Sequence, residues 1–318
     1  MDSTREMART YLVGLCMGSA DAVPGVSGGT IALIAGVYAR LIDAVTALTP
    51  RNGLRLLGAF VPPDRAAIQD AFADVDASFL LPLGVGILTA VVLVTRAVHY
   101  ADETHPVALF GFFFGLIGAS VVVLSREVEL SERRHAVAAI AGFSLAFALS
   151  GDATVLGGRG LALTFLAGAV AVTAMILPGI SGSLMLVILG QYTFMSATLS
   201  TFTDRLAALA TGGGTARLVD PGTTVVVFVA GGVVGLLTVA RAVDRALERD
   251  RETTLAFLVA LVVGALRAPI AEIGGREGVG WTAATIAEFA ALAAVGAVLL
   301  YALDRYAIDV EIDQAAGG

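Results

Sequence analysis

Two stretches of the sequence repeat a short pattern of residues suited to binding an anion. Both read Pro-Gly-x-Ser-Gly, at residues 24–28 and 178–182. Proline removes a backbone hydrogen-bond donor and glycine accepts irregular backbone, so each pattern predicts a break between two short helices. A helix that begins after such a break presents unpaired N–H groups and the positive end of its dipole. Both features favour phosphate.

The residues around each break supply further donors for a phosphate group. Serine and threonine contribute hydroxyl groups, and an arginine fork matches phosphate oxygens. We therefore predict one phosphate-binding site built from Ser27, Gly28, Gly29, Thr30, Ser181, Gly182, Ser183 and Arg40. The structural breaks themselves are assigned to Pro24, Gly25, Pro178 and Gly179. The alternative is that the small residues serve only tight packing of membrane helices, which is common at helix crossings.

An acidic residue, Asp21, lies three positions before Pro24. Acids within a membrane are costly and are commonly functional, so Asp21 is a candidate site for a coupling proton or sodium ion. The alternatives are an ordinary cap on the following turn, or an exposed residue if the hairpin is shallow. The second copy carries Met175 at the corresponding place, so such a coupling site would exist in one copy only.

The remaining reactive residues argue against metal, cofactor or covalent chemistry. Cys16 is the single cysteine, and no histidine or carboxylate pair accompanies either break. A membrane lipid-phosphate phosphatase would need a catalytic histidine or a metal cluster beside the phosphate. We expect no metal, no cofactor and no enzymatic activity. The histidines, at positions 99, 105 and 135, fall at the ends of predicted spans or in loops, where we expect them to be solvated.

The composition predicts the elements that must position these residues. The 318 residues are 57% apolar and only 15% charged, whereas an ordinary soluble domain carries about 25% charged residues. Residues 160–203 form 44 consecutive positions without a formal charge. The runs lack the alternation of a β-barrel, so we predict an all-α polytopic membrane protein with one transmembrane domain over residues 1–318. The net charge of −7 argues against nucleic acid as a partner.

Uncharged runs predict six transmembrane helices, and the two interrupted regions differ from them. Residues 10–48 and 161–199 are predicted to be re-entrant hairpins, each with its break at the tip. The six spans are predicted at Ala77–Thr95, Pro106–Ser125, Ala136–Gly151, Pro221–Ala240, Thr253–Leu266 and Trp281–Leu303.

The two interrupted regions are copies of each other. At an offset of 154 residues, seven of the fifteen positions from 24 to 38 are identical. Each copy is followed by three spans, an odd number, so the second copy must enter the membrane from the opposite side. The sequence therefore predicts an inverted-topology repeat with halves at residues 1–150 and 160–305. Broken helices at matching positions of inverted halves typically mark a transporter's substrate site.

The distribution of arginine predicts the orientation. With re-entrant hairpins, 14 of the 20 arginines fall on the side of the N-terminus, which predicts cytoplasmic N- and C-termini in a multi-pass cell-membrane protein. Single broken crossings would give a split of roughly 9 against 11 instead. The chain contains no lysine and is acidic, which indicates a prokaryote with either a salt-rich cytoplasm, as in halophilic archaea, or GC-rich codons.

The motifs also resemble those of a known family. Residues 18–32 with Gly36-Val37-Tyr38, and residues 177–183 with Gly190-Gln191-Tyr192, are similar to the paired signatures of the polyprenyl-phosphate (undecaprenyl-phosphate) translocase family, formerly a domain of unknown function. The resemblance implies a flippase that moves a lipid carrier, undecaprenyl phosphate or a dolichyl-type phosphate, between leaflets and returns it to the cytoplasmic face for cell-envelope biogenesis. Its partners would be that lipid, the surrounding membrane lipids and a coupling ion. A secondary transporter of a small ion or anion is the alternative.

Overall fold

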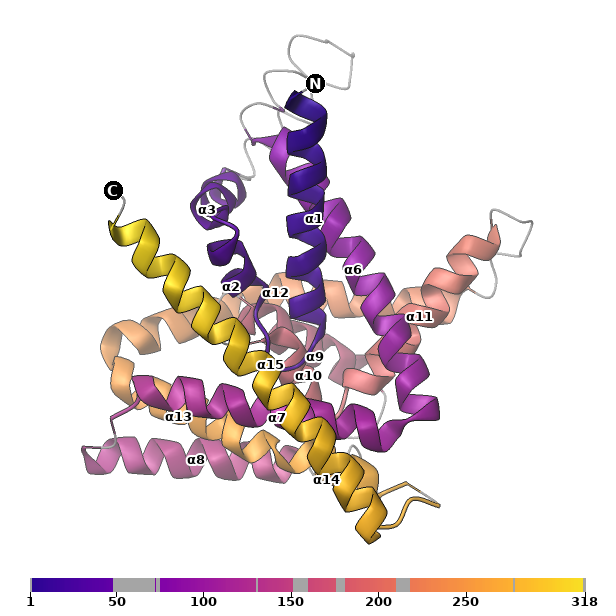
Figure 1. The fold of residues 1–318 in the computed structure, drawn as a ribbon, viewed down its shortest axis with the longest axis vertical. Helices are drawn as coiled ribbons and strands as arrows, with labels where there is room; N and C mark the ends of the chain where they lie inside the picture. The colour runs from indigo at the N-terminus through magenta and orange to yellow at the C-terminus, as the bar shows by residue number, and fades with distance from the viewer. Residues whose placement is uncertain are drawn as a thin grey trace. The chain divides into compact units, whose positions relative to one another are not determined.

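The computed structural model of the protein describes residues 2–47, 72, 75–129, 131–150, 160–175, 181–209, 218–276 and 278–316. These residues are almost entirely helical and include no strand (Figure 1). The first half contains α1 Asp2–Ala22, α2 Gly28–Ile34, α3 Tyr38–Thr46, α6 Ala77–Thr104, α7 Pro106–Leu124, the 3-10 helix η1 Ser125–Glu127 and α8 Arg133–Leu149. The second contains α9 Leu161–Ala174, α10 Gly182–Ile188, α11 Tyr192–Leu209, α12 Val219–Arg249, α13 Arg251–Ala265, α14 Arg267–Gly274 and α15 Ala283–Ala316.

Five of the six predicted spans lie on helices long and apolar enough to cross a membrane. They are Ala77–Thr104, Pro106–Leu124, Val219–Leu236, Arg251–Gly274 and Ala283–Tyr306. The remaining predicted span, Ala136–Gly151, coincides with α8, a helix of 17 residues that begins with two arginines and is somewhat short of the ~20 residues that a span needs. The second predicted hairpin contains a bent pair, since α10 and α11 meet at 117°. The all-helical membrane fold is therefore confirmed.

The chain divides into two compact units. The first unit comprises residues 1–20, 28–91 and 306–318, and the second comprises residues 21–27 and 92–305. Within the first unit, α1 packs on the first part of α6 through glycines: a Cβ atom at Gly14 would collide with the Leu83 carbonyl, and one at Gly86 with the Tyr11 carbonyl. Because these glycines have no side chain, the two helix backbones come into direct contact.

Within the second unit, α9 packs on α12 in the same way. A Cβ atom at Gly168 would collide with the Phe228 carbonyl, and one at Gly231 with the Phe165 carbonyl. These positions match the contact of α1 with α6, because Gly168 follows Gly14 by 154 residues and Gly231 follows Gly86 by 145. The repeat read from the sequence is thus accompanied by a repeated helix–helix contact.

Within the second unit, the third spanning helix of each half also packs closely on a helix of the other half. A Cβ atom at Gly142 of α8 would collide with the Phe257 carbonyl of α13, and one at Gly296 of α15 with the Phe112 carbonyl of α7. The helices α7, α8 and α13 accordingly lie alongside one another (Figure 1). The third helix of each half therefore packs on the second helix of the other half. The inverted orientation of the two halves remains a prediction.

The turn after each short helix is also repeated. Gly36 and Gly190 adopt positive φ angles of 70° and 63°. The next residue in each copy donates its N–H back into the short helix, from Val37 to the Ala32 carbonyl at 3.0 Å and from Gln191 to the Leu186 carbonyl at 2.8 Å. This is the Schellman ending, which favours glycine because glycine has no Cβ to clash in the left-handed region.

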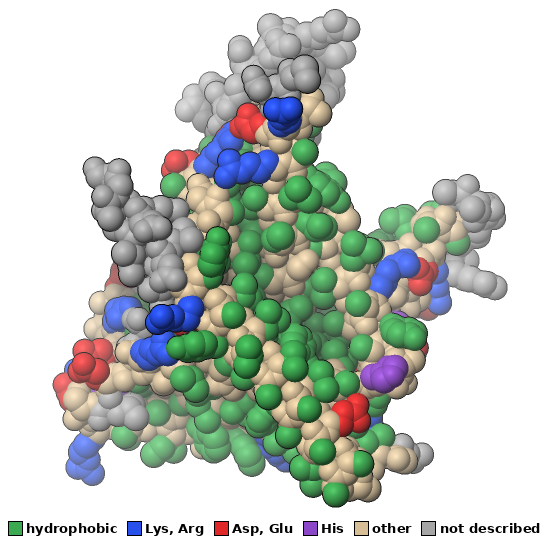
Figure 2. Space-filling model, in the orientation of Figure 1, with side chains coloured by type: hydrophobic (Ala, Val, Ile, Leu, Met, Phe, Trp, Pro, Cys, Tyr) green, Lys and Arg blue, Asp and Glu red, His purple; other side chains and the backbone are tan. Residues whose placement is uncertain are grey.

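Exposed apolar side chains mark surfaces suited to lipid. Hydrophobic side chains are spread widely over the face shown in Figure 2, whereas charged side chains form small groups near the ends of helices. Leu88 of α6 and Val298 of α15 are 66% and 69% exposed. Apolar side chains this exposed along spanning helices are stable in hydrocarbon and unfavourable in water.

Candidate functional site

The first break is held in place by α7. Gly25 lies in the break with φ of 89°, in the left-handed region. The Ser120 hydroxyl donates to the Gly25 carbonyl at 2.8 Å, and a Cβ atom at position 25 would lie 3.0 Å from that hydroxyl. Position 25 therefore needs glycine both for its backbone angle and for its close contact. Pro24 beside it is buried.

A tyrosine of the second copy contacts the chain just before this break. The Tyr192 hydroxyl at the start of α11 donates to the Ala22 carbonyl at 2.6 Å. The Tyr192 ring packs edge-to-face on Phe113 of α7, with 5.3 Å between ring centroids. The turn of the second copy is thereby joined to the first break. Pro178 and Gly179 lie outside the described residues, so a direct meeting of the two tips remains a prediction.

The predicted phosphate-binding residues occupy two kinds of environment. Ser27, Gly29 and Thr30 are half-buried and Gly28 is buried. Ser181, Gly182 and Ser183 are all buried, and the hydroxyls of the two serines lie 2.7 Å apart and bond each other. In this conformation the second copy therefore keeps its hydroxyl groups closed to a ligand. Their role in binding phosphate remains a prediction.

Arg40 is engaged by carboxylates. Its Nε donates to the Asp76 carboxylate at 2.6 Å and its Nη1 to the Glu6 carboxylate at 3.1 Å, while the guanidinium lies 4.5 Å from the centre of the Phe79 ring. The guanidinium holds the pKa of Asp76 below the ordinary aspartate value through this hydrogen bond. A phosphate would have to replace these carboxylates to bind Arg40. The other charged candidate, Asp21, is half-buried and has an interaction partner within the structure.

The expectation for one histidine was wrong. His135 is completely buried at the start of α8, with Nδ1 2.9 Å from the Glu129 carbonyl and Nε2 3.5 Å from the Glu252 carboxylate. The close packing of α8 on α13 encloses this position, which the linear sequence does not reveal. His105 is exposed, as expected. Among the described residues, no group of three or more His, Cys, Asp or Glu side chains is placed to hold a metal ion.

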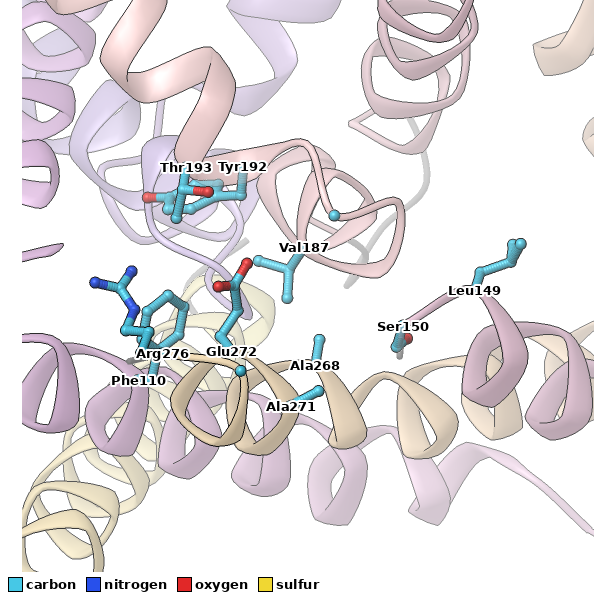
Figure 3. Close-up of a pocket in the computed structure, with 12 residues that line it drawn as sticks. Phe110, Leu149, Ser150, Val187, Tyr192, Thr193, Ala268, Ala271, Glu272 and Arg276 are labelled. Carbon is cyan, nitrogen blue, oxygen red and sulfur yellow. The ribbon is translucent and has the colours of Figure 1, made fainter. Parts of the chain in front are cut away.

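A cavity of about 230 Å³ lies beside the turn between α10 and α11 (Figure 3). Its walls come from α7, the end of α8, this turn and α14. In Figure 3, Glu272 projects from α14 toward Val187, and Arg276 lies beside the Phe110 ring. The cavity is lined by Phe110, Leu149, Ser150, Val187, Gly190, Tyr192, Thr193, Ala268, Ala271, Glu272, Gly275 and Arg276. The cavity therefore adjoins the Schellman turn at the end of α10, in the second copy of the repeat.

A wider cavity of about 570 Å³ adjoins the first and is more polar. The two share Gly190, Thr193, Glu272 and Arg276. The additional lining comes from the end of α6, one face of α11 and the start of α12: His99, Asp102, Glu103, Phe194, Ala197, Thr198, Thr201, Arg205, Asp220, Pro221 and Thr224. None of the eight predicted phosphate-binding residues lines either cavity.

Arg276 stands at the junction of the two cavities. Its Nη1 donates to the Asp102 carbonyl at 2.8 Å and its Nη2 to the Asp102 carboxylate. Its guanidinium also lies 5.5 Å from the centre of the Phe110 ring. Sequence reasoning missed this residue because it follows an apolar helix without any motif. Arg276 lies ten residues past the end of the predicted span Thr253–Leu266, where no pattern in the sequence marks it.

A second unexpected residue is Gln191, between the Schellman glycine and Tyr192. Its side chain is fully buried, and neither its oxygen nor its nitrogen has a hydrogen-bond partner in the described parts of the chain. Val37 occupies the matching position in the first copy. A buried amide without partners is costly, which makes its presence in one copy alone notable.

Comparison with known proteins agrees with this architecture. The profile of a family described as undecaprenyl phosphate translocase-like matches residues 17–276. A polyprenyl-phosphate transporter of Vibrio cholerae is 35% identical over 267 residues, which cover 83% of this chain and 77% of that protein. A polyprenyl-phosphate transporter of Staphylococcus aureus is 28% identical, over 80% of this chain and 83% of that protein. No solved structure matches the chain. The matched region contains both motifs and the helices that hold them, so the chain belongs to the undecaprenyl phosphate translocase-like family of membrane proteins.

Proposed function

We propose that the protein is a transporter, not an enzyme, that moves a polyprenyl phosphate lipid carrier between the leaflets of the cell membrane. The carrier is undecaprenyl phosphate or a dolichyl-type phosphate, returned to the cytoplasmic face for another round of cell-envelope assembly. The observation that carries the proposal is the duplicated break together with the duplicated helix contacts. It is supported by the relatives named polyprenyl-phosphate transporters.

The physical task of such a protein is to carry a charged headgroup past hydrocarbon. The isoprenoid chain is stable in the bilayer, whereas the phosphate is strongly disfavoured there. Irregular backbone inside a membrane is tolerated where it is buried in protein or lines a wet cavity. The two breaks, with Ser27–Thr30 and Ser181–Ser183, are proposed to receive the phosphate during the crossing. The bonded serines of the second copy would then exchange their mutual hydrogen bond for bonds to phosphate oxygens.

The proposal includes an orientation and a coupling site. Both termini lie in the cytoplasm of a prokaryote, as the arginine distribution predicts, and the lysine-free, acidic composition fits a halophilic archaeon. Asp21, close to the first break, binds a proton or sodium ion that offsets the charge of the phosphate. This arrangement would link movement of the lipid to an ion gradient.

The test is leaflet exchange in liposomes that contain the purified protein. A fluorescent short-chain polyprenyl phosphate is placed in both leaflets, and a reductant that cannot cross the membrane bleaches the outer pool. We expect protein-dependent loss of the protected inner pool, and a change of rate when a proton or sodium gradient is imposed. Exchange equal to that of protein-free liposomes, combined with protein-dependent flux of a small ion, would support the secondary ion transporter instead.

A further inference from the structure

We propose that the two joined cavities form a docking site for a phosphate group, in which Arg276 is the anchoring cation and Asp102 occupies the place of the anion until the ligand arrives. The inference rests on the proposed function for its choice of a phosphate monoester as ligand. It adds a site distinct from the Pro-Gly motifs, at the turn between α10 and α11.

Arg276 has the placement that an anchoring cation needs. It lines both cavities, and its side chain is 27% exposed. Phe110 supports the guanidinium on one side, which limits the positions it can take. Its Nε is buried without a hydrogen-bond partner among the described residues. A guanidinium carries five N–H donors, and Asp102 uses one on each terminal nitrogen. The terminal nitrogens thus keep bonding capacity beyond what Asp102 uses, and an arginine fork matches phosphate oxygens.

Asp102 occupies the position beside Arg276 that we propose for the phosphate. Asp102 engages the guanidinium through one carboxylate oxygen and its own backbone carbonyl, two acceptors that phosphate oxygens could replace. The Asp102 side chain is 18% exposed, at the end of α6, and directly lines the wider cavity. Carboxylates outnumber arginines in the walls of this cavity, with Asp102, Glu103, Asp220 and Glu272 against Arg205 and Arg276. A bound anion is therefore attracted by Arg276 but repelled by the carboxylates. Removal of the Asp102 charge should accordingly favour binding of a phosphate.

The lining of the two cavities fits a phosphate that carries an apolar chain. The smaller cavity presents Phe110, Val187 and Ala268 close to Arg276, while the wider cavity is polar. A phosphate held at the junction would have apolar walls on one side and polar walls on the other. The site draws residues from both halves, but no second, equivalent site is expected, since Thr193 at the junction corresponds to Ala39 in the first copy. Docking is therefore expected on one side of the repeat.

The experiment measures binding of geranyl phosphate and of inorganic phosphate to the full-length protein in detergent. Trp281, the single tryptophan, provides the signal: its Nε1 would lie 3.6 Å from a Cβ atom at Gly274, two residues before Arg276. Calorimetry gives an independent measure. We expect Arg276→Gln to weaken binding of geranyl phosphate by about tenfold or more, and Arg276→Lys by less, because lysine keeps the charge but loses the fork.

Two further variants separate the proposal from a loss of folding. Asp102→Asn should bind geranyl phosphate several-fold more tightly than the wild type, an outcome that damage to the fold would not produce. Arg126→Gln is the matched control, because Arg126 pairs with Asp304 at 3.5 Å and lines neither cavity. It should bind like the wild type. Unchanged binding in Arg276→Gln, or equal weakening in Asp102→Asn and Arg276→Gln, would overturn the proposal.

The two phosphate probes identify the source of the ligand. Preference for geranyl phosphate over inorganic phosphate supports a lipid headgroup, and equal binding of the two supports free phosphate. Leaflet exchange by the same preparations separates this inference from the proposed function. Wild-type exchange together with unchanged binding in Arg276→Gln would overturn the docking site alone, whereas intact binding without any exchange in the wild type would overturn the transport function alone.

Discussion

At the scale of single residues, Tyr192 joins the turn of the second copy to the chain before the first break. Tyr192→Phe removes the hydrogen bond to the Ala22 carbonyl and leaves that buried acceptor without its donor. We expect a loss of about 1–3 kcal/mol of stability, seen as a lower thermal midpoint, and slower leaflet exchange. Tyr301→Phe, on an exposed position of α15, is the control and should change neither measurement. Equal behaviour of the two variants would show that the contact carries no stability.

The ion pair between Arg40 and Asp76 predicts how the stability of the protein depends on pH. The pKa of Asp76 is lowered in the folded protein by the Arg40 hydrogen bond. The pair therefore stabilises the fold at pH values above the ordinary aspartate pKa of about 3.9, and this stabilisation is lost as the pH falls below it. The thermal midpoint of Asp76→Asn should be lower than that of the wild type at pH 7, by a small amount because the pair is partly solvated. The difference should shrink as the pH falls below about 3.9 and vanish once the pH lies below the lowered pKa of Asp76. A difference that does not shrink as the pH falls would contradict the assignment.

Asp21 was predicted from the sequence to be a coupling site, and the proposal can be tested at the same scale. Asp21→Asn keeps the size of the side chain and its hydrogen-bonding oxygen but removes the charge. We expect it to slow leaflet exchange and to abolish the response to an ion gradient, with little change in thermal midpoint. Glu288→Gln, at an exposed position of α15, is the matched control. Wild-type exchange with an unchanged gradient response in Asp21→Asn would show that Asp21 is only a structural cap.

At the scale of elements, the glycines of the repeated helix contacts predict paired effects. Gly86→Ala and Gly231→Ala each place a methyl group against a carbonyl of the neighbouring helix, in equivalent contacts of the two halves. We expect each to destabilise the protein by about 1–3 kcal/mol, measured as a fall in thermal midpoint. Gly84→Ala on the same helix as Gly86 meets no atom within 4 Å and should be neutral or stabilising. If Gly84→Ala proved as harmful as Gly86→Ala, close packing would not be the cause.

The helices also show which features of the fold can be predicted from apolar runs and composition. Apolar runs predicted where the spanning helices begin to within about three residues, because hydrocarbon requires long uncharged helices whatever their neighbours. The helices α6, α12 and α15 continue well past the C-terminal ends of the predicted spans, into charged residues that the apolar runs do not include. The burial of His135 was not predictable in this way either. It depends on how α8 lies on α13, which is determined by the close approach of Gly142 and Phe257.

At the scale of the whole molecule, the inverted topology predicts which residues share a face of the membrane. Glu103 and Glu248 occupy equivalent positions, 145 residues apart. In a chain with Cys16→Ser, Glu103→Cys should react with an impermeant maleimide from outside intact cells, whereas Glu248→Cys should react only after the membrane is opened. Glu6→Cys, near the N-terminus, should behave like Glu248→Cys. Labelling of Glu103→Cys and Glu248→Cys from the same face would contradict the inversion.

The sequence by itself determined the helical membrane fold, the positions of the breaks and the existence of the repeat. These features follow from local rules: uncharged length, the missing N–H of proline, the freedom of glycine, and identity at a fixed offset. The tertiary structure decided which distant residues meet. Tyr192 lies 170 residues from its partner Ala22, and Arg276 lies 174 residues from Asp102. No periodic signal connects such positions, because their contact depends on the packing of whole helices, and a cavity exists only where that packing leaves space.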